Sequence, residues 1–169
     1  MDYTVIKPEE LSGNVFSDIG KKWMLIGAAK KNGSCNAMTA SWGGMGILWS
    51  ENVFFCFVRP QRYTREFCDE SDIITLSFFD EKYRSALSLC GRTSGRDGDK
   101  LAKAGLHPVV GKNGEVDFEE SEICIVGKKL YAQPIDPNGF TEDGTDKANY
   151  PAKDYHIMYV CKILEVRKK

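Results

Sequence analysis

Short hydrophobic runs, rich in β-branched and aromatic side chains, alternate with polar segments along the chain. Such runs are typical of β-strands. The pattern predicts strands at 23–29, 53–58, 73–79, 123–126 and 157–161. The run at 53–58 is hydrophobic at every position, so a strand there is buried on both faces, inside a barrel or against a helix.

Two further segments have the spacing of helices. We expect one helix at 64–70, with Thr64 as its N-cap, and a second at 83–90; a third follows Asp97. Many strands with few helices, and no regular alternation between them, favour an antiparallel β-barrel over a doubly wound sheet. We therefore predict a mainly β protein with appended helices.

Length and charge narrow the class of protein. The 169 residues, 42% of them hydrophobic, suit a single domain over 1–169. With 23 basic and 24 acidic residues, the chain lacks the positive excess of most nucleic-acid binders. No hydrophobic run approaches the roughly 18 residues of a membrane-spanning helix. Residues 1–8 show no secretory signal, so we expect a cytoplasmic protein that contacts neither nucleic acid nor membrane.

Cysteine and histidine spacing argues against a metal site. Six cysteines include no Cys-x-x-Cys pair, and Cys56, Cys124 and Cys161 lie in hydrophobic runs. We interpret them as core thiols, with a reactive thiol as the alternative. His107 and His156 are too few for a multi-histidine site, so no metal is expected.

Small polar and hydrophobic residues alternate over 36–42. A strand through this segment sets Asn36, Met38, Ala40 and Trp42 on one face and the residues between them on the other. One face is then polar enough to lie against a ligand. The alternative is an ordinary edge strand that runs into a turn at Gly43 and Gly44.

Residues 59–65 follow a predicted buried strand and open a predicted helix. Pro60 restricts the turn, Thr64 caps the helix, and the arginines at 59 and 62 lie close in sequence. Backbone N–H groups and guanidinium groups at such a turn can converge on an anion. A solvated loop with three arginines is the alternative.

The segment 94–100 has a similar character. Gly95 and Gly98 permit the positive φ angles of an anion-binding nest, Ser94 offers a hydroxyl, and Arg96 and Lys100 offer positive charge. The alternative is a loop before a helix, with its charges in water and an aspartate as the cap. Two basic, helix-opening turns in a chain of net charge -1 together suggest one phosphate-bearing ligand.

Four motifs appear in a fixed order across about residues 10 to 167. They are Asn36-x-Met-Thr-Ala-Ser-Trp42, Arg59-Pro-x-Arg-Tyr-Thr64, Ser94-Gly-Arg-Asp-x-Asp-Lys100 and Asp154-Tyr-His156. In this order the chain resembles the flavin reductase-like family of FMN-binding split barrels, close to its flavoredoxin-type members. The resemblance implies a six-stranded antiparallel Greek-key barrel, a homodimer, and noncovalently bound FMN as cofactor.

The resemblance also implies roles for individual residues. The residues expected beside the isoalloxazine ring of FMN are Asn36, Met38, Thr39, Ala40, Ser41 and Trp42. Those expected around the FMN phosphate are Arg59, Arg62, Thr64, Ser94, Arg96 and Lys100. His156 is the candidate catalytic residue near the ring, and its alternative is a residue at the start of a strand with both ring nitrogens satisfied by the protein.

The activity implied is that of an oxidoreductase, which transfers electrons from NAD(P)H through FMN to a flavin, a protein or a small acceptor. An FMN electron carrier that receives electrons from a protein donor and has no nicotinamide site is one alternative. A split barrel that binds no flavin is another. The polar segment 134–151 is interpreted as a surface loop, with a lid over a ligand as the alternative.

Overall fold

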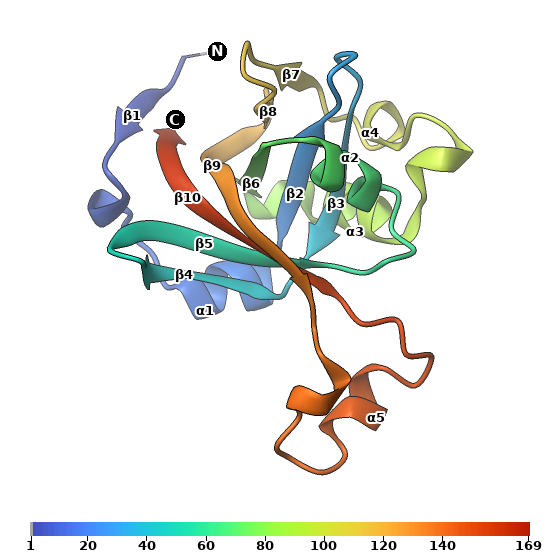
Figure 1. Cartoon of the computed structure of the whole chain (residues 1–169). Coiled ribbons are helices and arrows are strands. Elements are labelled where there is room, and N and C mark those ends of the chain that lie inside the picture. Colours follow the sequence, from blue (N-terminus) through green and yellow to red (C-terminus); the bar gives the residue numbers. More distant parts are fainter. Residues whose placement is uncertain (1) are drawn as a thin grey trace.

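Two long antiparallel strands, β9 and β10, form the centre of the fold in the computed structural model, which describes residues 2–169 (Figure 1). The main sheet has eight strands, in the order β3-β2-β6-β9-β10-β5-β4, with β1 beside β10, and all pairs are antiparallel. The strands are β1 Thr4–Ile6, β2 Met24–Ala29, β3 Cys35–Ala40, β4 Gly43–Leu48, β5 Glu51–Val58, β6 Ile73–Phe79, β9 Ser121–Pro134 and β10 Ile157–Lys168. A separate hairpin pairs β7 Pro108–Val110 with β8 Val116–Phe118.

The predicted β-barrel is confirmed, and its sheet has eight strands where six were expected. The additional β1 has three residues and pairs only with the C-terminal end of β10. β9 is also much longer than the predicted strand at 123–126, because Gly127, Lys128 and Lys129 interrupt the hydrophobic run and the rest of the strand is exposed. Gly43 and Gly44 begin strand β4 and form no turn.

The helices are short and connect strands. They are α1 Val15–Ser17, α2 Thr64–Glu70, α3 Arg84–Arg92, α4 Lys100–Lys103 and α5 Thr145–Asn149. The predicted helix at 64–70 is confirmed, but Thr64 is its first residue and does not cap it. Its hydroxyl instead accepts a hydrogen bond from the side chain of Asn36 on β3, at 2.9 Å.

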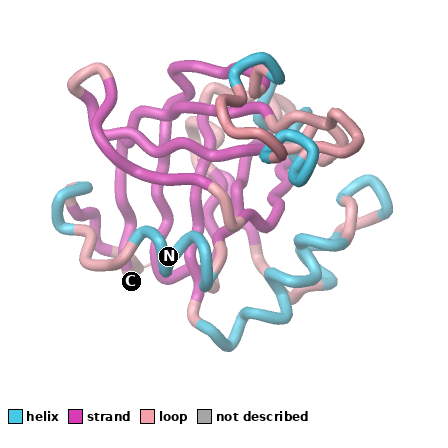
Figure 2. The backbone as a smooth tube through the Cα atoms, turned by 90° about the horizontal axis from the view of Figure 1, so that it is seen from below, coloured by secondary structure: helices cyan, strands magenta, loops and turns pink. Residues whose placement is uncertain are grey.

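The strands of the main sheet, magenta in Figure 2, enclose a hydrophobic core. A second cluster packs α3 and α4 against β2 and β3. Cys56, Cys124 and Cys161 are fully buried free thiols, which confirms their interpretation as core residues. Burial raises the pKa of all three thiols, so the uncharged form is favoured. No helix among the described residues is long and apolar enough to cross a membrane.

Residues 135–156, here called the arm, connect β9 to β10 and project from the barrel (Figure 1). The arm contains α5 and a single turn of 3-10 helix at Pro137–Gly139, so it is more ordered than the predicted surface loop. Three aromatic side chains, Phe140, Tyr150 and Tyr155, contact one another within it. Two hydrogen bonds from Arg59 at the end of β5 hold the base of the arm.

Candidate functional site

Two adjacent cavities open beside the C-terminal end of β3. One has a volume of about 400 Å³ and the other about 160 Å³. Both are lined by Met38, Gln61 and Arg62, so they adjoin along one continuous surface. The four motifs singled out in the sequence all contribute residues to this surface, although they lie up to 120 positions apart in the chain (36 to 156).

The larger cavity is lined by the end of β3 and the two residues after it, by residues in and just after β5, and by His156 just before β10. Five of the six residues predicted beside a flavin ring line it: Met38, Thr39, Ala40, Ser41 and Trp42. Asn36 does not, because its side chain is buried against α2 and donates to Thr64. The indole of Trp42 is 44% exposed at the mouth of the cavity. This lining of small, hydroxyl-bearing and aromatic side chains suits a flat aromatic ligand with polar edges.

His156, just before β10, contributes a buried imidazole to the same cavity. Its ring centroid lies 4.9 Å from that of Trp42. The Nδ1 atom lies 3.0 Å from the hydroxyl of Tyr150 in the arm. Burial, together with the positive charge of Arg59, lowers the pKa of His156 to about 4, so the ring is neutral near pH 7.

Arg59 lines the larger cavity and not the smaller one, where the other predicted phosphate ligands Arg62, Thr64, Ser94 and Lys100 lie. Its guanidinium donates to the carboxylate of Asp154 and, at 3.0 Å, to the backbone carbonyl of Asn149. The guanidinium carbon also lies 5.5 Å from the ring centroid of Tyr150. Arg59 therefore clamps the arm to the barrel, and a carboxylate already balances its charge.

The smaller cavity is strongly cationic. Arg62, Arg92 and Lys100 line it, and its lining contains no aspartate or glutamate. None of these three side chains forms a salt bridge with any residue in 2–169. Thr64 and Ser94 add two hydroxyl groups. A small cavity with uncompensated cations and hydroxyl donors suits a phosphate dianion.

The C-terminal end of α3 holds two of these cations through backbone carbonyls. Lys100 Nζ donates to the carbonyls of Cys90 and Thr93, at 3.1 and 3.3 Å, and Arg62 Nη1 donates to Gly91, at 2.6 Å. The negative end of a helix dipole favours positive charge there. Carbonyl groups are neutral, so both side chains keep their full charge toward the cavity, and one N–H of the ammonium has no protein partner among the described residues.

The turn before α4 explains how Lys100 reaches this position. Gly98 has a φ of 128°, which reverses the chain, and Asp99 caps α4 by accepting from the backbone N–H of Ala102. Leu101 then packs into the second core cluster, which leaves Lys100 directed at α3. Lys100 is only 4% exposed, and burial, with the charge of Arg62 as a further cause, lowers its pKa to about 8.

Of the two glycines predicted to have a positive φ in a nest at 94–100, Gly98 has one and Gly95 does not. Anion binding by this turn stays a prediction. Gly95 is needed for a different reason, because a Cβ there would lie 2.7 Å from Oδ1 of Asn36. Arg96 lines neither cavity: it donates to Glu66 at 2.6 Å and lies over the ring of Tyr63.

Several cavity residues carry no signal that sequence reasoning used. They are Phe57 in the larger cavity, Gln61 in both, and Arg92 and Thr93 in the smaller one. Arg92 is the informative omission, because α3 continues two residues beyond its predicted end. Had the predicted helix been continued to residue 92, a basic residue in its last turn, two positions before Ser94, would have indicated Arg92 as a cavity residue.

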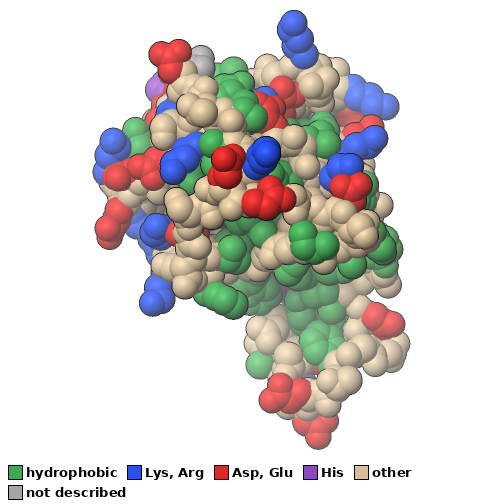
Figure 3. Space-filling view, turned by 90° about the vertical axis from the view of Figure 1, so that its left-hand side faces the viewer, with side chains coloured by type: hydrophobic (Ala, Val, Ile, Leu, Met, Phe, Trp, Pro, Cys, Tyr) green, Lys and Arg blue, Asp and Glu red, His purple; other side chains and the backbone are tan. Residues whose placement is uncertain are grey.

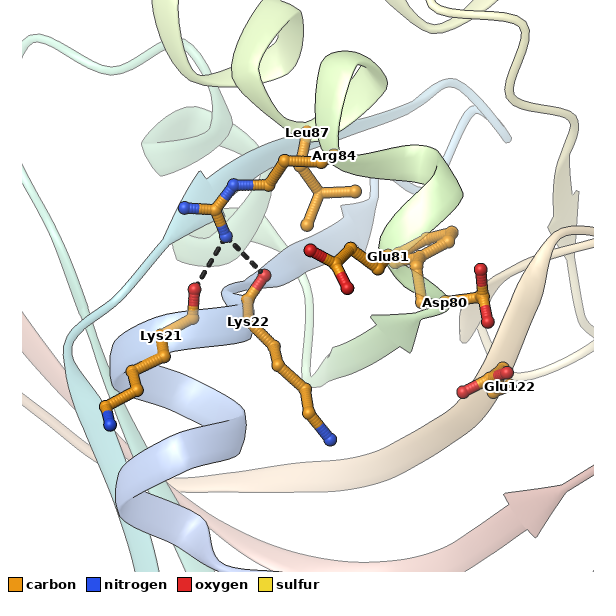
Figure 4. A pocket seen from close by; sticks show the side chains of 8 residues that line it. Lys21, Lys22, Asp80, Glu81, Arg84, Leu87 and Glu122 are labelled. Carbon is orange, nitrogen blue, oxygen red and sulfur yellow. Dashed lines mark hydrogen bonds between the residues drawn. The ribbon is translucent and has the colours of Figure 1, made fainter.

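A cavity larger than either of these two lies elsewhere, between the 3-10 turn before α3 and the π-helical turn Asp18–Lys22 (Figure 4). Its volume is about 520 Å³. Arg84 donates to the carbonyls of Lys21 and Lys22, as the dashed lines show, and Lys22 pairs with Asp18 at 2.9 Å. Side chains of both charges line it, including Asp80, Glu81 and Glu122. Such mixed lining favours no single class of charged ligand.

Comparison with known proteins identifies the fold. No protein-family model and no curated protein matches the chain. Solved structures do match. An FMN-binding domain of a flavin reductases-like enzyme from Shewanella baltica is 12% identical, with a TM-score of 0.69 over 99% of this chain and 77% of that one.

Two flavoredoxins are similar in the same way. The one from Desulfovibrio vulgaris is 20% identical, with a TM-score of 0.68 over 97% of this chain and 77% of that one. The one from Methanosarcina acetivorans is 17% identical, with a TM-score of 0.69 over 97% and 76%. At these identities the match concerns the fold, and it confirms the split-barrel fold predicted from the sequence.

Proposed function

We propose that the protein binds FMN across the two joined cavities and acts as an oxidoreductase. The observation that carries this proposal is the division of one continuous surface into an aromatic, hydroxyl-lined part and a cationic part without carboxylates. FMN has the same division, between its ring and its phosphate. The names of the structural neighbours, which include FMN-binding and flavoredoxin proteins, support the same ligand.

In this proposal the chain supplies binding and orientation. Bound FMN would supply the redox chemistry, by accepting a hydride from NAD(P)H and passing electrons to a flavin, a protein or a small acceptor. The backbone and hydroxyls of residues 38–42 would hold the polar edge of the ring. Arg62, Lys100 and the newly identified Arg92 would hold the phosphate, with Thr64 and Ser94 as hydroxyl donors.

Visible spectroscopy of the freshly purified protein tests the proposal. We expect a yellow protein whose flavin absorbance bleaches when NADH or NADPH is added without oxygen. Bleaching by dithionite alone would remove the nicotinamide part of the proposal, and reduction by a protein donor would then favour the electron carrier. A colourless protein that takes up no added FMN would contradict FMN binding altogether.

We further propose a homodimer, supported by an exposed hydrophobic surface. Figure 3 shows hydrophobic side chains gathered on the lower part of the barrel next to the arm, whereas charged side chains spread over its upper part. Ile47 is 71% exposed and Trp49 is 59% exposed, and Trp49, between β4 and β5, contacts Tyr131 of β9. Exposed clusters of this kind commonly mark protein interfaces. Light scattering on the eluting protein would show twice the chain mass.

The cytoplasmic location stays a prediction.

A further inference from the structure

We propose that Tyr150 in the arm is a positioning residue that fixes the tautomer of His156, so that the imidazole presents an Nε2–H donor to the larger cavity. The segment that connects β9 to β10 would in this way determine the hydrogen-bonding character of a site in the barrel. The part of this inference that concerns the flavin rests on the proposed function, and the tautomer itself does not.

The contact between the two side chains is buried. The Tyr150 hydroxyl lies 3.0 Å from Nδ1 of His156, and both residues are more than nine-tenths buried. A hydrogen bond in such surroundings is costly to leave unmade. One of the two groups must donate, and the donor decides which ring nitrogen carries the proton.

Two observations indicate that Tyr150 is the donor. Burial raises the pKa of its phenol, so the hydroxyl keeps its proton. Among the described residues, Nδ1 of His156 is also the one hydrogen-bond partner of the phenol oxygen. A proton on Nδ1 would leave the phenol proton without an acceptor, so the pair is best satisfied when the phenol donates to Nδ1. The neutral ring then carries its proton on Nε2.

The Nε2 atom is available to a ligand. Among the residues that the structure describes it has no hydrogen-bond partner, and the His156 ring lines the larger cavity beside Trp42. The ring is neutral near pH 7 because burial and Arg59 lower its pKa to about 4. It can therefore donate to a carbonyl edge of the ligand without adding a positive charge to the cavity.

Arg59 keeps Tyr150 in place. Its guanidinium lies over the Tyr150 ring, donates to the carbonyl of the preceding Asn149, and binds the carboxylate of Asp154. These three contacts lie on both sides of Tyr150 in the arm. The phenol is consequently held against His156 from the barrel side, which explains why Arg59 is clamped here and not directed at the smaller cavity.

NMR of the nitrogen-15-labelled protein tests the inference directly, because the chain has only two histidines. Two-bond proton–nitrogen spectra distinguish Nε2–H from Nδ1–H tautomers. We expect a single Nε2–H tautomer for His156 in the unsubstituted protein and a mixture of both in Tyr150→Phe. His107, which contacts Glu120 at the surface, serves as an internal reference and should not change.

Tyr155→Phe is the matched control. Tyr155 packs against Tyr150 in the same aromatic cluster, but its hydroxyl donates to Asp146 and not to His156. The control should keep the tautomer. An Nδ1–H tautomer in the unsubstituted protein would overturn the inference, whether or not either variant folds. An unchanged tautomer in folded Tyr150→Phe would overturn it as well.

The consequence for the ligand is measured separately. Loss of one ordered neutral hydrogen bond in Tyr150→Phe should weaken FMN and riboflavin equally, by about two- to tenfold, because the contact concerns the ring and not the phosphate. A loss confined to FMN would contradict this assignment. A protein that binds neither flavin would contradict the proposed function, and the tautomer measurement on the free protein would still stand.

Discussion

Two pairs of cationic side chains lie close together at this site, and they differ in the groups that accept their hydrogen bonds. Arg62 and Lys100, at the end of α3, are held by neutral backbone carbonyls. Arg59 and Arg96 are instead held by carboxylates: Arg59 pairs with Asp154, and Arg96 pairs with Glu66. The charge of the first pair is not neutralised by a carboxylate, whereas the charge of the second pair is balanced within the protein.

The same distinction separates the site from the larger cavity beside Arg84. That cavity also contains a carbonyl-held arginine, Arg84, but Asp80, Glu81 and Glu122 share its lining. The cationic cavity is less than a third of its volume, about 160 against 520 Å³, and has no carboxylate in its lining. We therefore place the proposed phosphate site by uncompensated charge and not by volume.

We expect the largest loss of FMN affinity in Lys100→Met, because this substitution removes a cation that is held by backbone carbonyls. One charge-assisted contact is worth about 1.5 to 3 kcal/mol, so FMN should bind roughly 10 to 150 times more weakly. Riboflavin, which has no phosphate, should be unaffected. Titration of the flavin-free protein, followed by flavin fluorescence, measures both affinities.

Lys103→Met is the control for that substitution. Lys103 lies on the same short helix, α4, but its side chain is exposed and lines neither cavity. Its removal should leave the FMN affinity nearly unchanged. Equal losses in the two variants would mean that α4 contributes only a general positive potential, and they would remove Lys100 from the phosphate site.

The barrel and most cavity residues could be predicted from the sequence because their signals are local. Hydrophobic runs identified the strands, and the motifs at 36–42 and 94–100 identified segments that meet in space. The charge partners could not be predicted. Glu66 and Asp154 neutralise Arg96 and Arg59 across 30 and 95 positions, and nothing in either segment alone indicates such a pairing.

The role of Gly95 shows a second limit. A glycine in a polar turn suggests a positive φ, but here it permits close approach of the backbone to Asn36. Asn36 itself was predicted to face a ligand, and it instead joins β3 to α2 through Thr64. Both are tertiary contacts between segments far apart in sequence, which local patterns do not encode.

We expect a change in pH to alter the FMN affinity less than Lys100→Met does. The change should act through Lys100, in the carbonyl-held pair, and not through the carboxylate-held pair. Lys100 has a pKa of about 8 in the free protein, so its charge is largely present at pH 7 and largely lost at pH 9. FMN affinity should fall about tenfold over that range, where the phosphate stays dianionic. Lys100→Met should abolish most of this dependence, and titrations at intermediate pH values measure it.

The stability of the flavin-free protein should change in the opposite direction. Burial lowers the Lys100 pKa from 10.5 to about 8, so between these values the unfolded chain binds more protons than the folded one. The free energy of unfolding therefore gains a contribution that rises with pH across this window. Comparison of denaturant midpoints for the unsubstituted protein and Lys100→Met isolates it. If the midpoint changes by the same amount between pH 8 and pH 10 in both proteins, the pKa of Lys100 is not lowered and its side chain is solvated.

The smallest effect is expected from Arg96→Ala, which removes a carboxylate-paired cation. Exposed ion pairs contribute about 0 to 1 kcal/mol, so the FMN affinity should change less than about fivefold. Glu66→Gln sharpens the comparison, because it frees Arg96 without removing it. If the carboxylate is what restrains Arg96, this variant should bind FMN as tightly as the unsubstituted protein or slightly more tightly. A loss in Arg96→Ala as large as that in Lys100→Met would instead show that Arg96 leaves Glu66 when the phosphate binds, and that pairing in the free protein does not decide which cations serve the ligand.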